Sequence, residues 1–326
     1  MRVVKYYLLI FFLIILLLPY TISVFVLKNP KEEKKQTDDF FEVLLYRTET
    51  DTVEKIDCYD YICNVLSGEM SASDESEALK AQAVACYTYL LGRINYVKEN
   101  PNEDIGHKGA YVCDDSSHCM AYLEKEIAKE KWGDSYFEKY YRNISDAVGD
   151  VIGLAITYDS LPINAVFHSV SSGRTQSAQE VWGAEVPYLI SVDSSFDKTA
   201  DGFETETRFS KERFREIFKE ELGVDLPKSV DCWIGETEKT ESGLVKQITV
   251  ADTVYTGTYI RKLFSLRSSC FDVKLEDSDI VFTVRGYGHG VGMSQHGAKQ
   301  LAKKGYDFRE ILSYYYSGIE IKYQNP

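Results

Sequence analysis

The most strongly patterned stretch of the chain is its amino-terminal end, where polar side chains almost vanish. Residues 6–27 are nearly all apolar, a length that allows a helix to cross a bilayer. A cleaved signal peptide is the alternative, but no small-residue cleavage pattern follows Leu27. The polar run up to Asp39 has the composition of a solvated tether. We therefore predict a transmembrane helix within residues 1–28, a tether over 29–39 and one folded region over 40–326.

Beyond residue 40 the apolar spacing alternates between helical and strand periods. Residues 74–96 carry apolar side chains at helical spacing, and Asp74 and Glu77 stand as a capping pair at the start. Two strands are predicted on either side of a turn at 159–162, where β-branched residues flank turn formers. The remaining predictions are a charged helix over 201–222, strands over 243–263 and two short helices after Gln295. The fold class predicted is α+β, with helices and antiparallel strands in separate runs behind a single-pass transmembrane helix.

Charge and cysteine content limit the partners and the compartment. The chain has 37 basic and 51 acidic residues, a net charge of −14, which argues against a nucleic-acid partner. Its seven cysteines cannot all pair within the chain, so some are free or bind metal. Cys86 lies in an Ala-rich helical pattern and is expected to be a buried apolar residue. Cys58 and Cys63 could pair, but their spacing alone does not decide this.

One short segment gathers four residues of the types that bind zinc. His107, Cys113, His118 and Cys119 fall within thirteen positions, and a complete set of four ligands would make a structural site. The spacing is not that of a standard zinc finger. A disulfide between Cys113 and Cys119 is equally compatible with the sequence and fits an external compartment.

A lone carboxylate, Glu69, stands in a predicted loop just before the helix predicted from residue 74. Position alone favours a carboxylate that complements the helix dipole. Three loops elsewhere, at 167–175, 181–189 and 285–298, are rich in glycine, histidine and other polar residues, as ligand-binding loops are. Together these features make Glu69 a candidate catalytic residue.

Four motifs in this order resemble the stage II sporulation protein D family of peptidoglycan lytic transglycosylases. They are GEM-x-A with EALKAQAVA at 68–85, SSGRT at 171–175, VWG-x₃-PYL-x-SVD at 181–193, and G-x-GHGVGMSQHGA at 286–298. The resemblance spans most of the chain after the tether. The sequence departs from the family pattern at Ser71, where Pro is usual, and at Tyr87, where Arg is expected.

The resemblance implies a function and a set of site residues. The implied reaction cleaves the MurNAc–GlcNAc bond of peptide-stripped glycan strands to 1,6-anhydro ends, with Glu69 as both acid and base, during septal remodelling and engulfment. Because the sugar supplies the nucleophile, no second carboxylate is required. Residues in the matched segments are expected to bind substrate: Lys80, Ser172, Arg174, Tyr188, Tyr287, His289 and Gln295. His168 and His296 are expected to have structural roles.

The resemblance also implies a cofactor, partners and a location. Clostridial relatives are thought to bind zinc in the loop that corresponds to 107–119, which favours a structural zinc over the disulfide. An amidase of the stage II sporulation protein P type and other engulfment membrane proteins are the implied partners. The catalytic region is expected outside the cytoplasm, on the mother-cell membrane facing the septum. Two rivals remain: a noncatalytic wall-binding amidase enhancer, and a hydrolase that uses the zinc.

Overall fold

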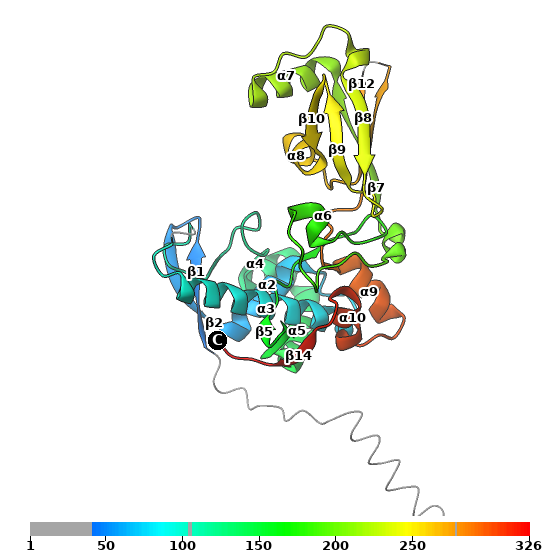
Figure 1. Cartoon of the computed structure of the whole chain (residues 1–326). Coiled ribbons are helices and arrows are strands. Elements are labelled where there is room, and N and C mark those ends of the chain that lie inside the picture. The colour runs from blue at the N-terminus through cyan, green and yellow to red at the C-terminus, as the bar shows by residue number, and fades with distance from the viewer. Residues whose placement is uncertain (1–40, 104–105, 278) are drawn as a thin grey trace, which may run out of the picture. The chain divides into compact units, whose positions relative to one another are not determined.

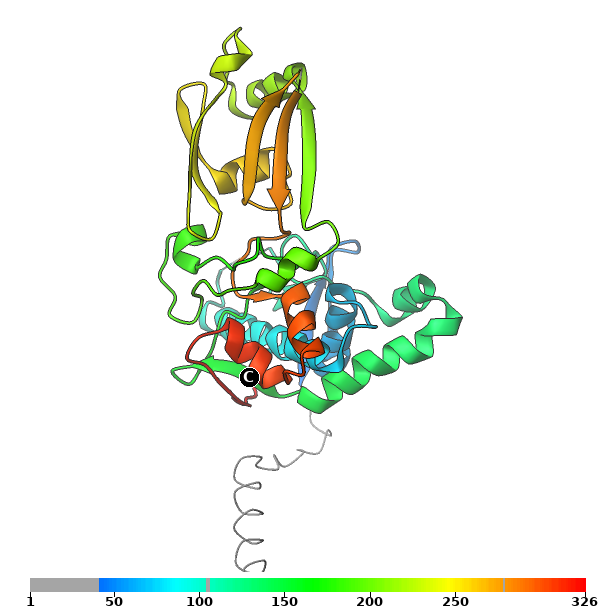
Figure 2. The ribbon, with the colours of Figure 1, turned by 90° about the vertical axis from the view of Figure 1, so that its right-hand side faces the viewer.

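The computed structural model describes residues 41–103, 106–277 and 279–326, which belong to one compact unit, Phe41–Pro326 (Figure 1). The predicted anchor at 1–28 and tether at 29–39 lie outside the described residues. Short strands and helices alternate along the chain, and their order can be followed by colour in Figures 1 and 2.

The centre of the fold is a group of helices packed around α3 (Ser76–Glu99). Small side chains let its neighbours approach closely, since Ala81, Ala83 and Ala85 are all buried. Its partners are α2 (Cys58–Glu69), α5 (Asp134–Val151), α9 (Gln295–Lys303) and α10 (Phe308–Tyr315), and α4 (Lys125–Trp132) packs on α5. The carboxyl-terminal helices thus return to the helix that follows Glu69.

Three small sheets border these helices. β1 (Glu42–Arg47) pairs antiparallel with β2 (Thr52–Asp57) and parallel with β3 (Val112–Cys113). β4 (Leu154–Tyr158) lies between β5 (Leu161–Pro162) and β14 (Glu320–Tyr323). β6 (Phe167–His168) runs parallel to β13 (Met293–Ser294). This pairing joins the two predicted loops at 167–175 and 285–298. A short helix, α6 (Ala178–Trp182), and a 3-10 turn, η1 (Ser195–Thr199), connect these parts.

An insertion, residues 204–285, begins and ends at neighbouring points of this region. Gly286, directly after it, donates its N–H to the carbonyl of Phe203, directly before it, at 2.8 Å. The insertion contains two three-stranded antiparallel sheets and two helices, and it buries an aromatic cluster of its own that includes Phe214, Trp233 and Phe282. Its elements are β7 (Glu204–Ser210), α7 (Lys211–Leu222), η2 (Val230–Cys232), β8 (Ile234–Lys239), β9 (Val245–Val250), β10 (Thr253–Thr256), α8 (Gly257–Leu263), β11 (Phe271–Glu276) and β12 (Asp279–Arg285).

Several predicted elements are confirmed and others are wrong. The helix over 74–96, the turn at 159–162 and the two carboxyl-terminal helices are present. The charged helix over 201–222 is wrong in its first half, because the side chains of β7 alternate between half-buried and exposed against β12. The capping pair is also wrong: Glu75 is the N-cap of α3 and its side chain makes no capping bond.

The predicted fold class needs correction. The described region is mixed α/β, and two of its strand pairings, β1 with β3 and β6 with β13, are parallel. Within 41–103, 106–277 and 279–326, no helix is long and apolar enough to cross a membrane. The two longest of these helices, α3 and α5, have 24 and 18 residues, and both carry charged side chains and pack within the domain. The single-pass transmembrane helix is therefore not part of the fold class that the structure supports.

Candidate active site

Glu69 is held by two hydrogen bonds from distant parts of the chain. It is the last residue of α2, so the sequence prediction of a loop at this position was wrong. Its Oε1 accepts the backbone N–H of Ala121 at 2.7 Å, and its Oε2 accepts Nε2 of Gln295 at 3.0 Å. Gln295 is the first residue of α9, and the side chain of Ser294 caps that helix by accepting the N–H of Gly297. The GEM and SQHG motifs, which the sequence identified separately, thus meet at one carboxylate.

Burial makes Glu69 easier to protonate than an ordinary carboxylic acid. Removal from water raises the pKa of Glu69, and the hydrogen bonds from Ala121 and Gln295 oppose this by favouring the carboxylate. Burial has the larger effect. A carboxyl group with a raised pKa holds its proton to higher pH than an ordinary glutamic acid, as a group that has to give a proton and take one back requires.

The carboxyl group of Glu69 lines a cleft with a volume of about 490 Å³. The cleft also contains His296, Lys299, Lys303 and two further carboxylates, Asp74 and Asp201. Asp74 forms an ion pair with Lys299, and its side chain is only 8% exposed, so it is committed to that pair. Asp201 is exposed and is the carboxylate that a hydrolytic mechanism would need beside Glu69.

Gly68 allows the loop that contacts Glu69 to lie directly on α2. A Cβ at this position would be 2.9 Å from the carbonyl carbon and oxygen of Ala121 and 3.0 Å from the backbone nitrogen of Tyr122. These atoms belong to the backbone and cannot move aside as a side-chain end can. Glycine is therefore required here for close approach of the loop, and the N–H of Ala121 reaches Glu69 as a consequence.

For the glycan cleavage that the sequence resemblance implies, replacing Gly68 by Ala is expected to lower kcat/KM about 100-fold, because displacement of the loop removes one of the two groups that hold Glu69. Gly92→Ala is the matched control, since Gly92 is also helical and a Cβ there meets nothing within 4 Å. The measurement is kcat/KM together with the melting temperature of each variant. Equal kcat/KM for the Gly68 variant and wild type would contradict a positioning role for this loop.

The four predicted metal ligands come together in the structure. Their ligand atoms all lie within 4.8 Å of one another. Nε2 of His107 is 3.6 Å from Sγ of Cys119, and Nδ1 of His118 is 3.7 Å from Sγ of both Cys113 and Cys119. A tetrahedral zinc with ordinary bond lengths places nitrogen and sulfur ligands about 3.5 Å apart. The nitrogens of His107 and His118 are closer, at 2.8 Å, but the set of donors fits a four-coordinate metal.

The alternative of a disulfide in this loop is not realised, since Cys113 and Cys119 are both free. All seven cysteines are free, including Cys58 and Cys63. Cys86 is fully buried in α3, as predicted. The His/Cys cluster could therefore hold a metal ion, and four protein ligands would leave it no open position for substrate.

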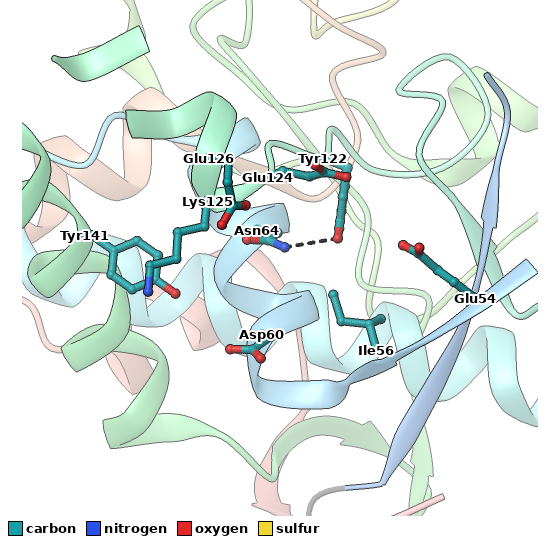
Figure 3. A pocket seen from close by; sticks show the side chains of 9 residues that line it. All are labelled: Glu54, Ile56, Asp60, Asn64, Tyr122, Glu124, Lys125, Glu126 and Tyr141. Atoms are coloured by element: carbon teal, nitrogen blue, oxygen red, sulfur yellow. Dashed lines mark hydrogen bonds between the residues drawn. The ribbon is translucent and has the colours of Figure 1, made fainter. Parts of the chain in front are cut away.

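The metal-ligand cluster is directly connected to the Glu69 contact. Ala121 follows Cys119 by two residues, and the next residues are fixed on α2: Tyr122 accepts Nδ2 of Asn64 at 3.0 Å, and Leu123 donates to the Asn64 carbonyl at 3.0 Å. Figure 3 shows the Asn64–Tyr122 bond at the wall of a second pocket, of about 320 Å³, whose other side chains are largely acidic.

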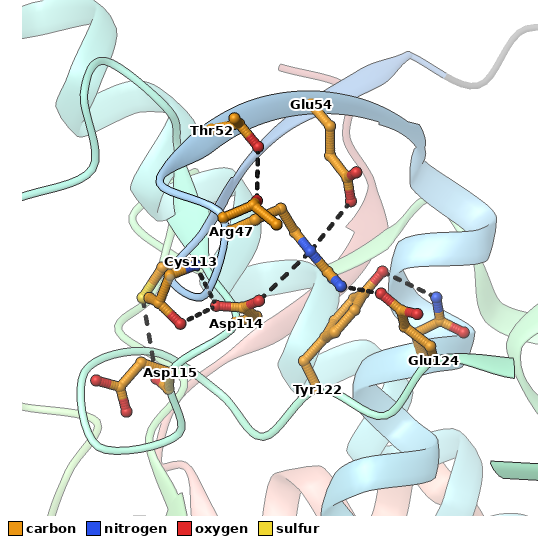
Figure 4. A network of polar contacts seen from close by, with 11 residues as sticks. Arg47, Thr52, Glu54, Cys113, Asp114, Asp115, Tyr122 and Glu124 are labelled. Carbon is orange, nitrogen blue, oxygen red and sulfur yellow. Dashed lines mark hydrogen bonds and ion pairs between the residues drawn. The ribbon is translucent and has the colours of Figure 1, made fainter. Parts of the chain in front are cut away.

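The loop that carries the cluster is tied to the first hairpin by Arg47. Its guanidinium forms ion pairs with Glu54, Asp114 and Glu124, which come from β2 and from both ends of the loop (Figure 4). The N–H of Ala121 is thus presented by a segment that is fixed at several points.

Of the predicted substrate-binding residues, the structure brings only Gln295 into contact with Glu69. Lys80 is engaged by Glu77 and Asp150, at 2.9 and 3.1 Å. Ser172 donates to the carbonyl of Ser242 in the insertion, and Arg174 donates to Ser191. The remaining three are Tyr188, which accepts the N–H of Asn164, Tyr287, which is exposed, and His289, which accepts the N–H of Val291. Their contacts with substrate stay predictions.

The other histidines differ in their surroundings. His168 is buried and bonds the carbonyl of Val291, in agreement with a structural role. His296 contacts Thr199 and Gln300 and also lines the Glu69 cleft, so its ring faces the candidate site as well as the loop it supports. Burial lowers the pKa of His289 to about 4, so this ring is neutral at pH 7.

One group at the site could not be predicted from residue types. The N–H of Ala121 belongs to the backbone, and an alanine gives no chemical signal in the sequence. Its only indications were Gly68 next to the catalytic candidate and a loop fixed by metal-binding residue types two positions earlier.

Comparison with known proteins identifies the class to which this fold and site belong. The sequence model of a family described as Stage II sporulation protein matches residues 46–158, which include Glu69, α3 and all four metal-ligand candidates. Stage II sporulation protein D of Bacillus subtilis (strain 168) is 36% identical over 280 residues, covering 85% of this chain and 78% of that protein. The protein of the same name from Bacillus amyloliquefaciens is 34% identical over 280 residues, with 86% and 78% covered.

The chain therefore belongs to the stage II sporulation protein D family, and it is a protein of sporulation. A more distant relative, named Amidase enhancer, comes from Bacillus subtilis (strain 168). It is 25% identical over 312 residues, which cover 79% of this chain but 39% of that protein.

Proposed function

We propose that this protein is a lytic transglycosylase that cleaves peptide-stripped glycan strands of peptidoglycan at the MurNAc–GlcNAc bond, with Glu69 as the catalytic acid and base. The observation that supports it most directly is one half-buried carboxyl group, held at both oxygens, in a cleft large enough for sugars. Burial raises its pKa, as an acid that must be protonated before reaction requires.

The reaction needs one proton donor and returns that proton. Glu69 protonates the glycosidic oxygen as the bond from C1 of MurNAc to that oxygen breaks. The resulting carboxylate then takes the proton of the C6 hydroxyl, whose oxygen bonds to C1 and closes the 1,6-anhydro ring. Ala121 and Gln295 stabilise the carboxylate between these two steps by hydrogen bonding. No water enters the products, so no second carboxylate has to activate one.

The products of peptide-free strands incubated with residues 41–326 test the proposal. Mass spectrometry distinguishes anhydro ends from reducing ends, which differ by one water. Anhydro ends are expected. Reducing ends would mean hydrolysis with Asp201 as the partner carboxylate, and no cleavage by folded protein would remove the catalytic proposal.

Activity is expected to fall as pH rises through the pKa of Glu69, because only the protonated form can donate to the leaving oxygen. Since burial raises this pKa, the fall should occur above the range of an ordinary glutamic acid. A pH profile of kcat/KM measures it. A rate that increases across the same range would show that the protonated carboxyl group is not the acting form.

A second candidate function is noncatalytic binding to the wall with stimulation of an amidase. The specific support is the similarity to the protein named Amidase enhancer. The two candidates differ in one measurement, because a wall-binding enhancer would stimulate an amidase equally well with Gln at position 69.

The proposed setting is the septal wall outside the cytoplasm, during engulfment, with an amidase of the stage II sporulation protein P type and other engulfment proteins as partners. An amidase would supply the stripped strands. We further propose that His107, Cys113, His118 and Cys119 bind one structural zinc ion, whose role is to fix the loop that carries Ala121.

A further inference from the structure

An arginine of the insertion lies beside two segments of the Glu69 cleft. The guanidinium of Arg267 is 4.5 Å from the ring centre of Tyr287, and its Nη1 donates to the carbonyl of Gly202 at 3.0 Å. Gly202 directly follows Asp201, which lines the cleft. Tyr287 exchanges both backbone hydrogen bonds with Val170, another cleft residue, at 2.7 and 3.1 Å. Arg267 therefore contacts two residues, Gly202 and Tyr287, that are each joined through the backbone to a residue lining the cleft.

Arg267 has no acidic partner among the described residues, although the chain carries 51 acidic residues. Across the described ranges, no carboxylate oxygen forms an ion pair with Arg267 or with Arg261, the second arginine of this segment. Arg261 instead donates Nε to the carbonyl of Leu266 at 3.3 Å and interacts electrostatically with Tyr287. By contrast, Arg285, two residues before Tyr287, pairs with Glu204 and Asp272.

The contrast indicates which guanidinium groups are available to a ligand. The charge of Arg285 is compensated within the protein, whereas those of Arg261 and Arg267 are not. Each of the latter two donates one hydrogen bond to a backbone carbonyl of the described residues, and a guanidinium has further N–H donors for an anion. The ring of Tyr287 supports the flat guanidinium of Arg267 and fixes its plane.

The proposed substrate carries an anion that matches this feature. Once the peptide is removed, each MurNAc has a free lactyl carboxylate, whereas on peptide-bearing strands the same group is an uncharged amide. Guanidinium groups bind carboxylates through two parallel hydrogen bonds, a geometry that an amide cannot reproduce. We propose that Arg267, assisted by Arg261, binds the free lactyl carboxylate of MurNAc and thereby selects peptide-stripped strands. This inference rests on the substrate of the proposed function, but not on cleavage.

The test measures binding without turnover, in protein that carries Glu69→Gln. Two ligands are used: peptide-free glycan oligosaccharides, and the same oligosaccharides with the lactyl carboxylate converted to its methylamide. The free acid is expected to bind about 10- to 100-fold more tightly, the range for a charge-assisted hydrogen-bonded pair. Adding Arg267→Gln should remove this preference by weakening binding of the acid while leaving that of the methylamide unchanged.

Two further variants make the outcome specific. Arg208→Gln removes one positive charge from β7 of the same insertion, where Arg208 pairs with Glu206 and Glu276, and it should keep the preference. Arg267→Lys keeps the charge without the planar pair of donors and should retain only part of it. If Arg267→Gln weakens both ligands equally in a folded protein, or weakens neither, the inference is wrong.

Failure of this inference can be told apart from failure of the proposed function. If the Glu69→Gln protein prefers the free acid but the wild type makes no anhydro ends, transglycosylation alone is overturned. Anhydro ends from a protein that binds both ligands equally would overturn the role of Arg267 alone.

Discussion

Replacing Glu69 by Gln is expected to lower kcat for release of anhydro-ended fragments by about 1,000-fold or more. General acid or base catalysis by one group contributes about 10²- to 10⁴-fold, and here the same carboxyl group performs both steps. The amide can still fill the space beside Ala121 and Gln295, so the melting temperature should change little. The rate is measured by chromatography of fragments from peptide-free strands of defined length.

Asp201→Asn provides the informative comparison, because Asp201 is the exposed carboxylate of the same cleft. Under transglycosylation its loss should change kcat less than about tenfold, since the C6 hydroxyl and not water attacks C1. If Glu69→Gln and Asp201→Asn lose activity equally, and the wild-type products carry reducing ends, the site belongs to a hydrolase with paired carboxylates.

The elements predicted correctly are those whose signal is local. The spacing of small and apolar residues in α3 and the turn formers at 159–162 each determine structure within a few neighbours. The insertion was predicted only in part: β9 and β10 confirm the strands predicted over 243–263, but α8 occupies the end of that range. Strand β7 is highly charged and is a strand because it pairs with β12, far along the chain. Its alternating half-buried positions depend on tertiary contacts that periodicity alone did not separate from a helix.

The site shows the same division between residue chemistry and geometry. The four metal-ligand candidates were identifiable because their side-chain types are distinctive, and the structure brings them together. Glu69 was also identifiable, but its partners Ala121 and Gln295 lie 52 and 226 positions away. The raised pKa of Glu69 depends on burial between these segments and so could not be inferred from the sequence. Lys80 was predicted to bind substrate because of its motif, yet its ammonium group forms ion pairs with Glu77 and Asp150.

Removing the proposed zinc, by a chelator or by Cys119→Ser, is expected to lower the melting temperature by about 8 °C or more. Loss of a structural metal belongs to the changes that cost about 4 kcal/mol or more, and each kcal/mol shifts the melting temperature of a domain of this size by about 2–4 °C. Calorimetry measures the shift, and elemental analysis of purified protein should give one zinc per chain before chelation.

Cys232→Ser is the matched control, because Cys232 is free, exposed and outside the cluster, and it should leave both zinc content and melting temperature unchanged. Glycan cleavage should fall together with stability, since the loop released by metal loss carries the N–H that holds Glu69, and it should return when zinc is restored. A chelated protein that loses all activity while its melting temperature stays the same would point instead to a zinc that takes part in the reaction, which a site with four protein ligands does not allow.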